Sequence, residues 1–423
     1  MGEPGGTRGS ALAKALPVAI PGGIVVAAAG LSLVRQSGAG ALNTIYAEDG
    51  SIFLGSSYFD SPFDSITTPY AGYLHLVPRV LSLLVSVLPV SWAAAGLSLA
   101  AGVVTGLLAL LVFACTRDYL APWGRVLAAA VVVLVPVGQD ELPNSIANLH
   151  WPMLYALFWV LIARRLDTAL GVAAVLLISL SDLLVLVYAP LALWLWWRRR
   201  STYSLAVGVA LGVGLVAQAV AVLFGPSGRE LHPEPVKWAP WYILRAVPQA
   251  VWGQRWFGPT VDATWLVLAA LAWLVVVGVA LYAWRTRRPG WRLAVLAVVS
   301  SVAVYALPVA LSGQATPRYA AAPAMLLLTA ACALFLAPTA GGQAPVESDG
   351  WVPDTRYAIA TWAGVALVVF CFSVWAVNLR IPNQRSQGPV WSDELAKACV
   401  APAAEAEVPI TPVGWEVRVP CPR

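Results

Sequence analysis

Charged residues are scarce in this chain of 423 residues: they make up 11% of it, whereas soluble proteins carry about 25%. Hydrophobic residues make up 59%, and the mean hydropathy is +0.75. The chain also lacks a Walker-type phosphate loop and a GxGxxG stretch after a predicted strand, two common signs of a bound nucleotide. The shortage of charge excludes an ordinary soluble enzyme, and no motif predicts the use of a cytoplasmic nucleotide.

Long apolar runs recur from about residue 16 to residue 378, and they suit the roughly 30 Å hydrocarbon core of a membrane. They do not alternate between apolar and polar residues, as the strands of an outer-membrane barrel would. We therefore expect an all-α polytopic membrane protein. The predicted transmembrane helices number about eleven and lie at 16–35, 93–115, 122–138, 151–164, 168–180, 183–197, 203–225, 262–284, 293–311, 320–337 and 358–378.

The positive charge of the chain predicts its orientation in the membrane. The net charge is +5, but Lys and Arg are dispersed at the ends of apolar runs, which indicates membrane topology and no nucleic-acid partner. With the N-terminus in the cytoplasm, the inner segments hold 14 basic and 6 acidic residues, against 12 basic and 15 acidic outside. We expect a bacterial-type cytoplasmic membrane protein with its C-terminus and longer loops on the extracytoplasmic side.

The stretch 72–90 is apolar enough for a twelfth crossing, but that crossing would place the arginine clusters outside. We predict that it is a helix in the outer interface, carrying His75 and Arg79. The chain then divides into a transmembrane domain at 1–378, with the helix in its first outer loop at 36–92, and an extracytoplasmic tail at 379–423.

The tail contains two short stretches, VPITP and WEVRV, that are typical of strands bounded by Gly and Pro. Cys399 and Cys421 lie in this tail, whereas the other three cysteines lie in or beside apolar runs. Because disulfides persist outside the cytoplasm, we expect a bond between these two residues.

Acidic residues gather in the predicted outer loops. Glu48 and Asp49 follow the first span, and like charges held together raise one pKa, which suits a general base or a cation site. Asp140 and Glu141 stand in the next outer loop, which closes with Asn148, His150 and Trp151; Asp182 is a third acid at an outer helix end. The alternative without a function is that Glu48 and Asp49 simply keep their loop in contact with water. Trp151 would then be an interfacial aromatic residue with His150 as its polar neighbour.

Arginines lie on the same predicted face. Taken singly, Arg79, Arg245 and Arg255 are typical of arginines at the membrane interface, whose aliphatic chains lie along apolar surface while the charged group stays in water. Arg318 differs, because it sits in a short loop between two apolar spans with Tyr319 beside it, close enough to meet a lipid phosphate. Acids able to take a proton and cations able to hold a phosphate together suit transfer from a lipid phosphate.

The AEDG sequence at 47–50, the predicted helix at 72–90 and the Asn148, His150 and Trp151 pattern give the chain a family likeness. The first 200 residues resemble multi-span glycosyltransferases of the GT-C fold, which use polyprenyl-phosphate sugars as donors. These enzymes typically carry an acidic pair near the end of the first span. The tail is too short for the carbohydrate-binding module of larger relatives.

The resemblance implies roles for the residues of this chain. Asp49, or Glu48 as the close alternative, would remove the proton of an acceptor hydroxyl, with inversion at the sugar. Arg318, Tyr319, Arg79 and His150 would hold the donor phosphate. Sugar or acceptor contacts would fall to Asp140, Glu141, Asn148, Trp151, Asp182 and His75. The acceptor would be a cell-envelope glycan or glycolipid, and the other partners would be membrane lipids. The resemblance leaves open whether a divalent cation takes part.

Two other functions compete. A transporter or flippase would carry ionisable groups near mid-membrane, and the predicted spans are notably free of charge there. A polymerase or ligase of lipid-linked oligosaccharides would rely on outer-loop arginines and would need no acid after the first span. The necessity of an acidic residue at 48 or 49 therefore separates the glycosyltransferase from the polymerase.

Overall fold

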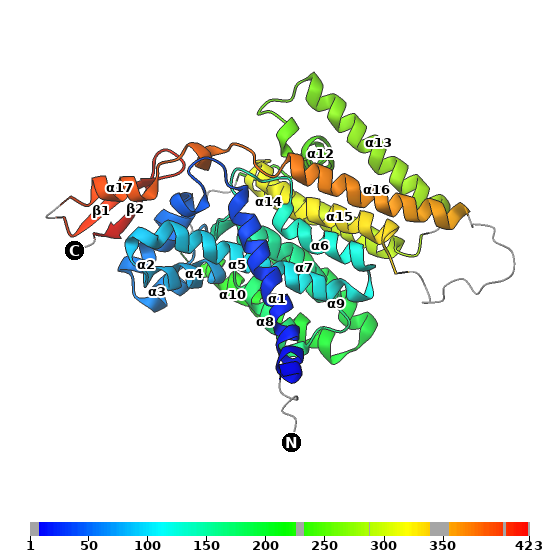
Figure 1. Cartoon of the computed structure of the whole chain (residues 1–423), viewed down its shortest axis with the longest axis horizontal. Coiled ribbons are helices and arrows are strands. Elements are labelled where there is room, and N and C mark those ends of the chain that lie inside the picture. Colours follow the sequence, from blue (N-terminus) through cyan, green and yellow to red (C-terminus); the bar gives the residue numbers. More distant parts are fainter. Residues whose placement is uncertain (1–7, 226–231, 287, 339–354, 401–402, 422–423) are drawn as a thin grey trace, which may run out of the picture.

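The computed structural model describes residues 8–225, 232–286, 288–338, 355–400 and 403–421. This part of the chain is mainly helical, as predicted, with one strand pair near its end (Figure 1). The α-helices are α1 (Arg8–Arg35), α2 (Gly55–Phe59), α3 (Pro62–Thr67), α4 (Leu76–Ser86), α5 (Ala93–Cys115), α6 (Pro122–Leu134), α7 (His150–Ile162), α8 (Thr168–Ser179), α9 (Ala189–Arg199), α10 (Thr202–Phe224), α11 (Trp238–Trp241), α12 (Val247–Trp252), α13 (Ala263–Thr286), α14 (Trp291–Ser312), α15 (Ala321–Phe335), α16 (Thr355–Val377) and α17 (Trp391–Ala398).

Tighter and wider helical turns join these helices. The π-helices are η2 (Asp49–Leu54) and η7 (Tyr242–Ala246). The 3-10 helices are η1 (Ala41–Asn43), η3 (Val90–Trp92), η4 (Thr116–Asp118), η5 (Ala147–Leu149), η6 (Leu183–Tyr188), η8 (Gln254–Trp256), η9 (Pro317–Ala320) and η10 (Gln384–Gln387). The strands are β1 (Glu405–Ile410) and β2 (Trp415–Pro420).

The number of membrane-capable helices is lower than the eleven expected. Five helical stretches in the described residues are long and apolar enough to cross a membrane: Val90–Asp118, Thr202–Phe224, Ala263–Thr286, Trp291–Ser312 and Pro317–Phe335. Six more apolar helices have 10–17 residues: Pro21–Arg35, Leu76–Ser86, Pro122–Leu134, Ala147–Ile162, Thr168–Ser179 and Thr361–Val377. At 1.5 Å per residue, stretches of this length span about 15–26 Å, which is less than the core of a bilayer, although Pro21–Arg35 and Thr361–Val377 belong to the longer helices α1 and α16 of 28 and 23 residues.

Local backbone chemistry explains why some predicted spans are shorter as helices. The run 122–138 is helical only to Leu134, because Pro136 disfavours helical geometry in the residue before it. The run 183–197 begins as the 3-10 helix η6 before α9 takes over with Pro190 in its first turn. Apolar composition continues through both interruptions, so hydropathy alone does not reveal them.

The helix α7 forms the centre of the bundle. Its residues from Trp151 to Ile162 are all buried, which fits a helix that is hydrophobic on every side. It packs against α5, α8 and α15. The first two of its buried side chains, Trp151 and Pro152, lie at the end of the bundle that carries the polar loops.

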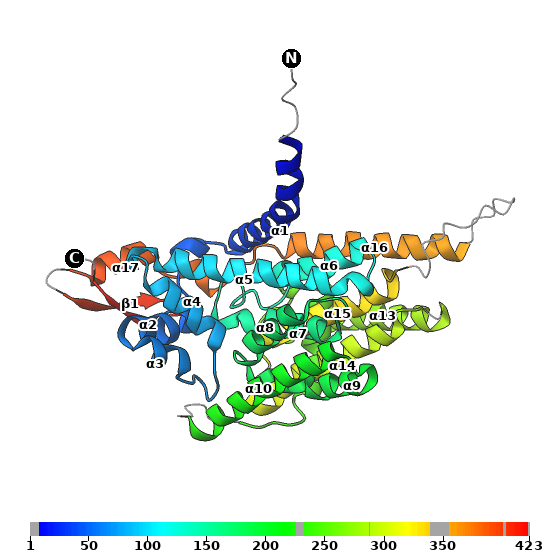
Figure 2. The same cartoon turned by 90° about the horizontal axis from the view of Figure 1, so that it is seen from below.

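The tail gathers at one end of the molecule. Figure 1 shows α17, β1 and β2 beside α2, α3 and α4, and Figure 2 shows the same group at the same end of the long axis. We call this the tail end. From there α5 and, beyond it, α15 and α16 run at a shallow angle to the long axis.

The disulfide and the two strands predicted for the tail are confirmed, although the first strand runs from Glu405 to Ile410 and not over VPITP at 408–412. The strands β1 and β2 pair antiparallel with Val408 opposite Val417, and both of these side chains are buried. Cys399 and Cys421 form a disulfide that ties the end of α17 to the end of β2.

Candidate functional site

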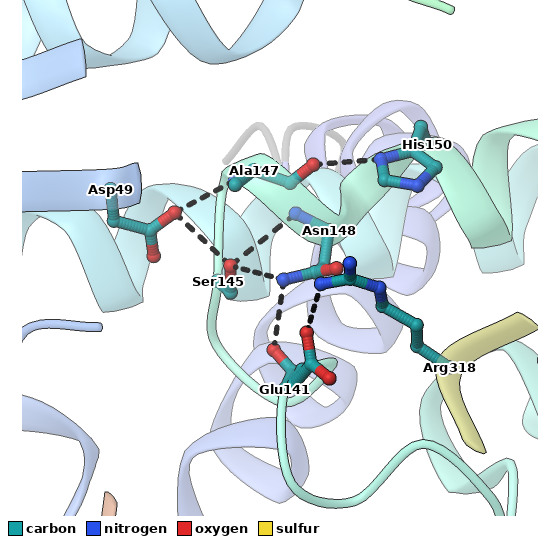
Figure 3. Close-up of polar contacts among 7 residues, drawn as sticks. All are labelled: Asp49, Glu141, Ser145, Ala147, Asn148, His150 and Arg318. Atoms are coloured by element: carbon teal, nitrogen blue, oxygen red, sulfur yellow. Dashed lines mark hydrogen bonds and ion pairs between the residues drawn. The ribbon is translucent and has the colours of Figure 1, made fainter. Parts of the chain in front are cut away.

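Asp49 lies at the centre of the polar contacts at the tail end. It is the first residue of η2 and its side chain is 1% exposed. Its carboxylate accepts hydrogen bonds from the hydroxyl of Ser145 (3.0 Å) and the backbone N–H groups of Ile146 (3.2 Å) and Ala147 (2.8 Å), as Figure 3 shows in part. The first and second predicted outer loops, about 97 residues apart, therefore meet at this side chain.

The backbone around Asp49 is held in unusual geometry. Ala47, two residues before it, has φ 34°, and Asn144, just before Ser145, has φ 59°. Left-handed backbone in a residue with a Cβ carries strain, and π-helices such as η2 are frequent at functional sites. Both features flank the same carboxylate, so its position is imposed by the surrounding fold.

The tail hairpin supplies that support. The N–H of Thr411, in the turn after β1, donates to the carbonyl of Ile45 at 3.1 Å, and the N–H of Ala47 donates back to the carbonyl of Thr411. Gly50 packs directly on the hairpin: a Cβ there would lie 2.6 Å from Cδ1 of Ile410. A larger residue at position 50 would push the carboxylate loop away from the tail.

Burial raises the pKa of Asp49 to about 7, against the opposing hydrogen bond from Ala147 and the charge of Arg385. A group with such a pKa changes charge near neutral pH, which is the range expected of an acid or base in catalysis. Its neighbour Glu48 is only partly buried, so the two acids of the predicted pair differ in access.

Arg318 and Glu141 form an ion pair within reach of this loop. Figure 3 shows Asp49 on one side of the 145–148 turn and the guanidinium of Arg318 on the other. Asn148 links the two halves, because its side-chain N–H₂ donates to the carbonyl of Glu141 (3.3 Å) and to the hydroxyl of Ser145 (3.1 Å).

The charges of this pair are coupled to Glu48. Burial raises the pKa of Glu141, while Arg318 lowers it and Glu48 raises it. Burial pulls the pKa of Arg318 down, but Glu141, Tyr319 and Glu48 together bring it above its ordinary value. Glu48 therefore lies close enough to act electrostatically on both members of the ion pair.

Tyr46 and Asp140 complete the acidic side of the site. Burial raises the pKa of Tyr46, and the charges of Glu141, Glu48 and Asp140 raise it further. Asp140 accepts a hydrogen bond from the side chain of Gln254 at 2.8 Å, and burial raises its pKa. Three of the four acids predicted in the two outer loops thus lie within electrostatic range of one tyrosine. Sequence reasoning missed Tyr46, although it stands in the same IYAED stretch.

The aromatic part of the predicted site lies beside Arg318. The rings of Trp151 and Tyr319 are 5.4 Å apart, and those of His150 and Trp151 are 4.5 Å apart. Nδ1 of His150 is 2.8 Å from the carbonyl of Ala147, so the imidazole is fixed by the same turn that holds Asp49. The guanidinium of Arg318 lies 5.6 Å from the centre of the Tyr319 ring.

Arg79 and His75 belong to a separate cluster. Arg79 donates to the carbonyl of Ser65 at 2.7 Å and lies 5.4 Å from the ring of Phe53, one turn beyond Asp49 in η2. His75 stacks on Tyr73 with ring centres 4.1 Å apart. The contacts of Arg79 in the described ranges are with Ser56, Ser65 and Phe53 and not with Arg318, so the structure does not unite all four predicted phosphate ligands.

Asp182 is also apart from the Asp49 group. It caps η6 by accepting from the N–H of Leu184 at 2.9 Å, and burial raises its pKa to about 7. Its second carboxylate oxygen is buried without a hydrogen-bond partner among the described residues. The adjacent Ser181 accepts from the N–H of Val77, which places this acid near α4.

Arg385 is a major site residue that sequence reasoning missed. It is 2% exposed and carries no carboxylate partner in the ranges the structure describes. Its guanidinium donates to oxygen atoms from the first loop, α5 and the second loop: those of Thr44, Ala41, Ser98, Pro143 and Asn144. A single arginine in a polar tail has no sequence pattern that would signal this role.

Neither a metal site nor a known family is indicated for the part of the chain that the structure describes. In the described part of the chain, no group of three or more His, Cys, Asp or Glu side chains is arranged to hold a metal ion. Searches against protein-family models, curated proteins and solved structures found no match.

Proposed function

We propose that this protein is an integral membrane glycosyltransferase that moves a sugar from a polyprenyl-phosphate donor to a hydroxyl of a cell-envelope acceptor. The observation that carries the proposal is the meeting of Glu48, Asp49 and the Arg318–Glu141 pair at one end of an apolar helix bundle. A proton acceptor and a phosphate-binding cation are the two groups that such a transfer requires.

The geometry favours Glu48 as the general base. A base must reach the proton that it removes, and Asp49 is buried and already accepts three hydrogen bonds. Glu48 is partly exposed and lies in the field of Arg318. In this assignment Asp49 is a positioning residue that holds the 145–148 turn.

The proposed reaction forms the bond between the acceptor oxygen and the anomeric carbon as the sugar–phosphate bond breaks. Glu48 takes the proton of the acceptor hydroxyl, and the electron pair of the broken bond leaves on the lipid phosphate. Arg318 turns from Glu141 to the phosphate and stabilises its developing charge. Attack from the face opposite the phosphate inverts the anomeric centre.

The proposed orientation places this end outside the cytoplasm of a bacterial-type cytoplasmic membrane. The disulfide between Cys399 and Cys421 lies at the same end, and disulfides persist in oxidising compartments. Each of the eleven apolar ranges contains a helix, but only five helical stretches of the described residues are long and apolar enough to cross a membrane, so crossings by the shorter helices would need a locally thinned bilayer.

The test is label transfer from a panel of radiolabelled polyprenyl-phosphate sugars in membranes that contain the wild-type chain or a variant. Glu48→Gln should lower transfer at least about 100-fold with an unchanged melting temperature. Asp49→Asn should lower both transfer and melting temperature. Asp60→Asn, an exposed acid of the same loop, is the control and should retain full activity.

Two results would change the proposal. If Asp49→Asn abolishes transfer at an unchanged melting temperature while Glu48→Gln keeps its activity, Asp49 and not Glu48 is the general base. No transfer from any donor by well-folded protein would favour a transporter or a polymerase of lipid-linked oligosaccharides.

A further inference from the structure

A large apolar cavity extends from α12, which packs beside η9 of the candidate site, towards Arg288 at the opposite end of α14. Its volume is about 790 Å³, and its walls come from α13, α14, α15 and α16, with Val247, Ala250 and Val251 of α12 closing one end. The cavity is open along one side, and its walls are almost wholly apolar. Inside a membrane, hydrocarbon chains are the material available to fill it.

The packing of α13 accounts for the cavity. Trp265 and Trp273 donate from their indole N–H groups to the carbonyls of Leu244 and Ile243, so the first half of α13 is held on η7. No comparable side-chain bond ties its second half to α14, α15 or α16 within the described residues. Figure 1 shows α13 and α16 diverging towards the start of α13 and converging towards its end, where the ring of Tyr282 stacks on Phe335 of α15 with centres 5.8 Å apart. The second half, from Val275 to Trp284, lines the cavity instead.

Among the described residues that line the cavity, Arg288 alone has a charged side chain. One of its terminal N–H groups donates to the hydroxyl of Tyr282 at 2.7 Å, and its guanidinium lies 5.1 Å from the centre of that ring. Its Nε is buried with no hydrogen-bond partner in the described part of the chain. Trp284 and Trp291 flank the same end, as aromatic residues do at a membrane interface.

The position of Arg288 distinguishes the occupant from a sugar donor. Arg288 precedes α14 and Arg318 follows it, so the two arginines stand at opposite ends of a helix of 22 residues, about 33 Å long. An anionic group at Arg288 would belong to the membrane leaflet opposite the candidate site. At the α12 end, the described residues that line the cavity, Val247, Ala250 and Val251, are all apolar.

We propose that this cavity is a binding site for an anionic diacyl phospholipid of the leaflet opposite the candidate site. The acyl chains occupy the space between α13 and the helices α14, α15 and α16. The headgroup phosphate accepts hydrogen bonds from Arg288 at the mouth, where Tyr282 orients the guanidinium.

The test is native mass spectrometry of the purified full chain in detergent with equal amounts of phosphatidylglycerol and phosphatidylcholine of identical acyl chains. The wild-type protein should retain phosphatidylglycerol about fivefold over phosphatidylcholine, the ratio expected of one arginine near a lipid charge. Arg288→Gln should remove that preference. Arg285→Gln, an exposed charge of the same turn outside the cavity, is the matched control and should keep it.

A second variant tests the acyl chains. Ala331→Phe places a ring in the cavity and should lower retention of both lipids at an unchanged melting temperature. Glycerol phosphate added in excess should not displace bound phosphatidylglycerol. Equal retention of the two lipids by wild-type protein, an equal effect of Arg285→Gln, full retention in Ala331→Phe or displacement by glycerol phosphate would each overturn the proposal.

Discussion

The guanidinium of Arg385 donates to the carbonyl oxygen of Thr44 at 2.7 Å, and this bond joins the C-terminal tail to the loop that carries Glu48 and Asp49. The same guanidinium reaches the carbonyls of Pro143 and Asn144 in the second polar loop. Three segments far apart in sequence are thus held by one side chain. The candidate site is built by the tail as much as by the helix bundle.

The first prediction concerns this arginine. Arg385→Gln should lower the free energy of unfolding by at least about 2 kcal/mol, because several buried carbonyls lose a charged donor. Thermal unfolding of the purified protein measures the change. Arg380→Gln, which removes an exposed arginine of the same tail with one long hydrogen bond to the carbonyl of Gln36 (3.4 Å), should stay within about 0.5 kcal/mol of wild type. Similar losses in both variants would show that Arg385 does not hold these segments together.

The second prediction concerns the pair Arg318 and Glu141. If Arg318 stabilises the leaving phosphate, Arg318→Gln should lower kcat/KM for transfer by about 100-fold, the effect of losing one transition-state donor. Arg255→Gln, an exposed arginine near the same end, should leave the rate unchanged. Retained transfer in Arg318→Gln would exclude the proposed phosphate contact.

The two side chains of this pair should also be coupled in stability. Each single change, Arg318→Gln or Glu141→Gln, leaves a partly buried charge without its partner, whereas the double change leaves none. We expect the double variant to be less destabilised than the sum of the single variants by about 0.5–3 kcal/mol. Additive effects would mean that the ion pair contributes nothing to the fold.

The tail and the site differ in how far the sequence predicted them. The strands and the disulfide followed from local signals: alternating short stretches, turn residues and two cysteines away from the apolar runs. The acids of both polar loops were also visible, because charge is rare in this chain. The number of membrane-capable helices could not be read from the sequence. Hydropathy records composition, and it does not show where Pro136 or the 3-10 helix η6 interrupts an apolar run.

Long-range contacts set the remaining limit. The hydrogen bonds of Arg385 to Thr44 cross 341 residues, and those of Asp49 to the 145–147 turn cross about 97. Neither pairing leaves a periodic pattern. The same holds for the unequal burial of Glu48 and Asp49, which arises because η2 turns one carboxylate into the 145–148 turn and leaves its neighbour partly exposed.

The third prediction concerns pH. Burial raises the pKa of Asp49 from its ordinary 3.8 to about 7, so folding favours the protonated form. Its contribution to stability is therefore fully present below about pH 4 and is lost as the pH rises towards 7. Relative to Asp49→Asn, the wild-type melting temperature should fall between pH 4 and 7 and stay level above that. Asp182 titrates in both proteins, so its effect cancels in the difference. Parallel curves across this range would contradict the raised pKa.

The fourth prediction concerns the disulfide. Cys399 and Cys421 are 22 residues apart, and closing a loop of this size stabilises a folded segment by about 3 kcal/mol in the chain-entropy picture. The hairpin that they close holds Ile45 and Ala47 through Thr411 and packs Ile410 on Gly50. The double variant Cys399→Ser with Cys421→Ser should therefore have a lower melting temperature. Because the Glu48 loop is loosened, its rate of transfer should also be lower.

A mild reductant should reproduce both losses in wild-type protein. It should have no further effect on the double variant, because the three other cysteines are buried and form no disulfides. If the reductant still acts on the double variant, the sensitivity belongs to one of those buried thiols, and the tail disulfide does not affect the candidate site.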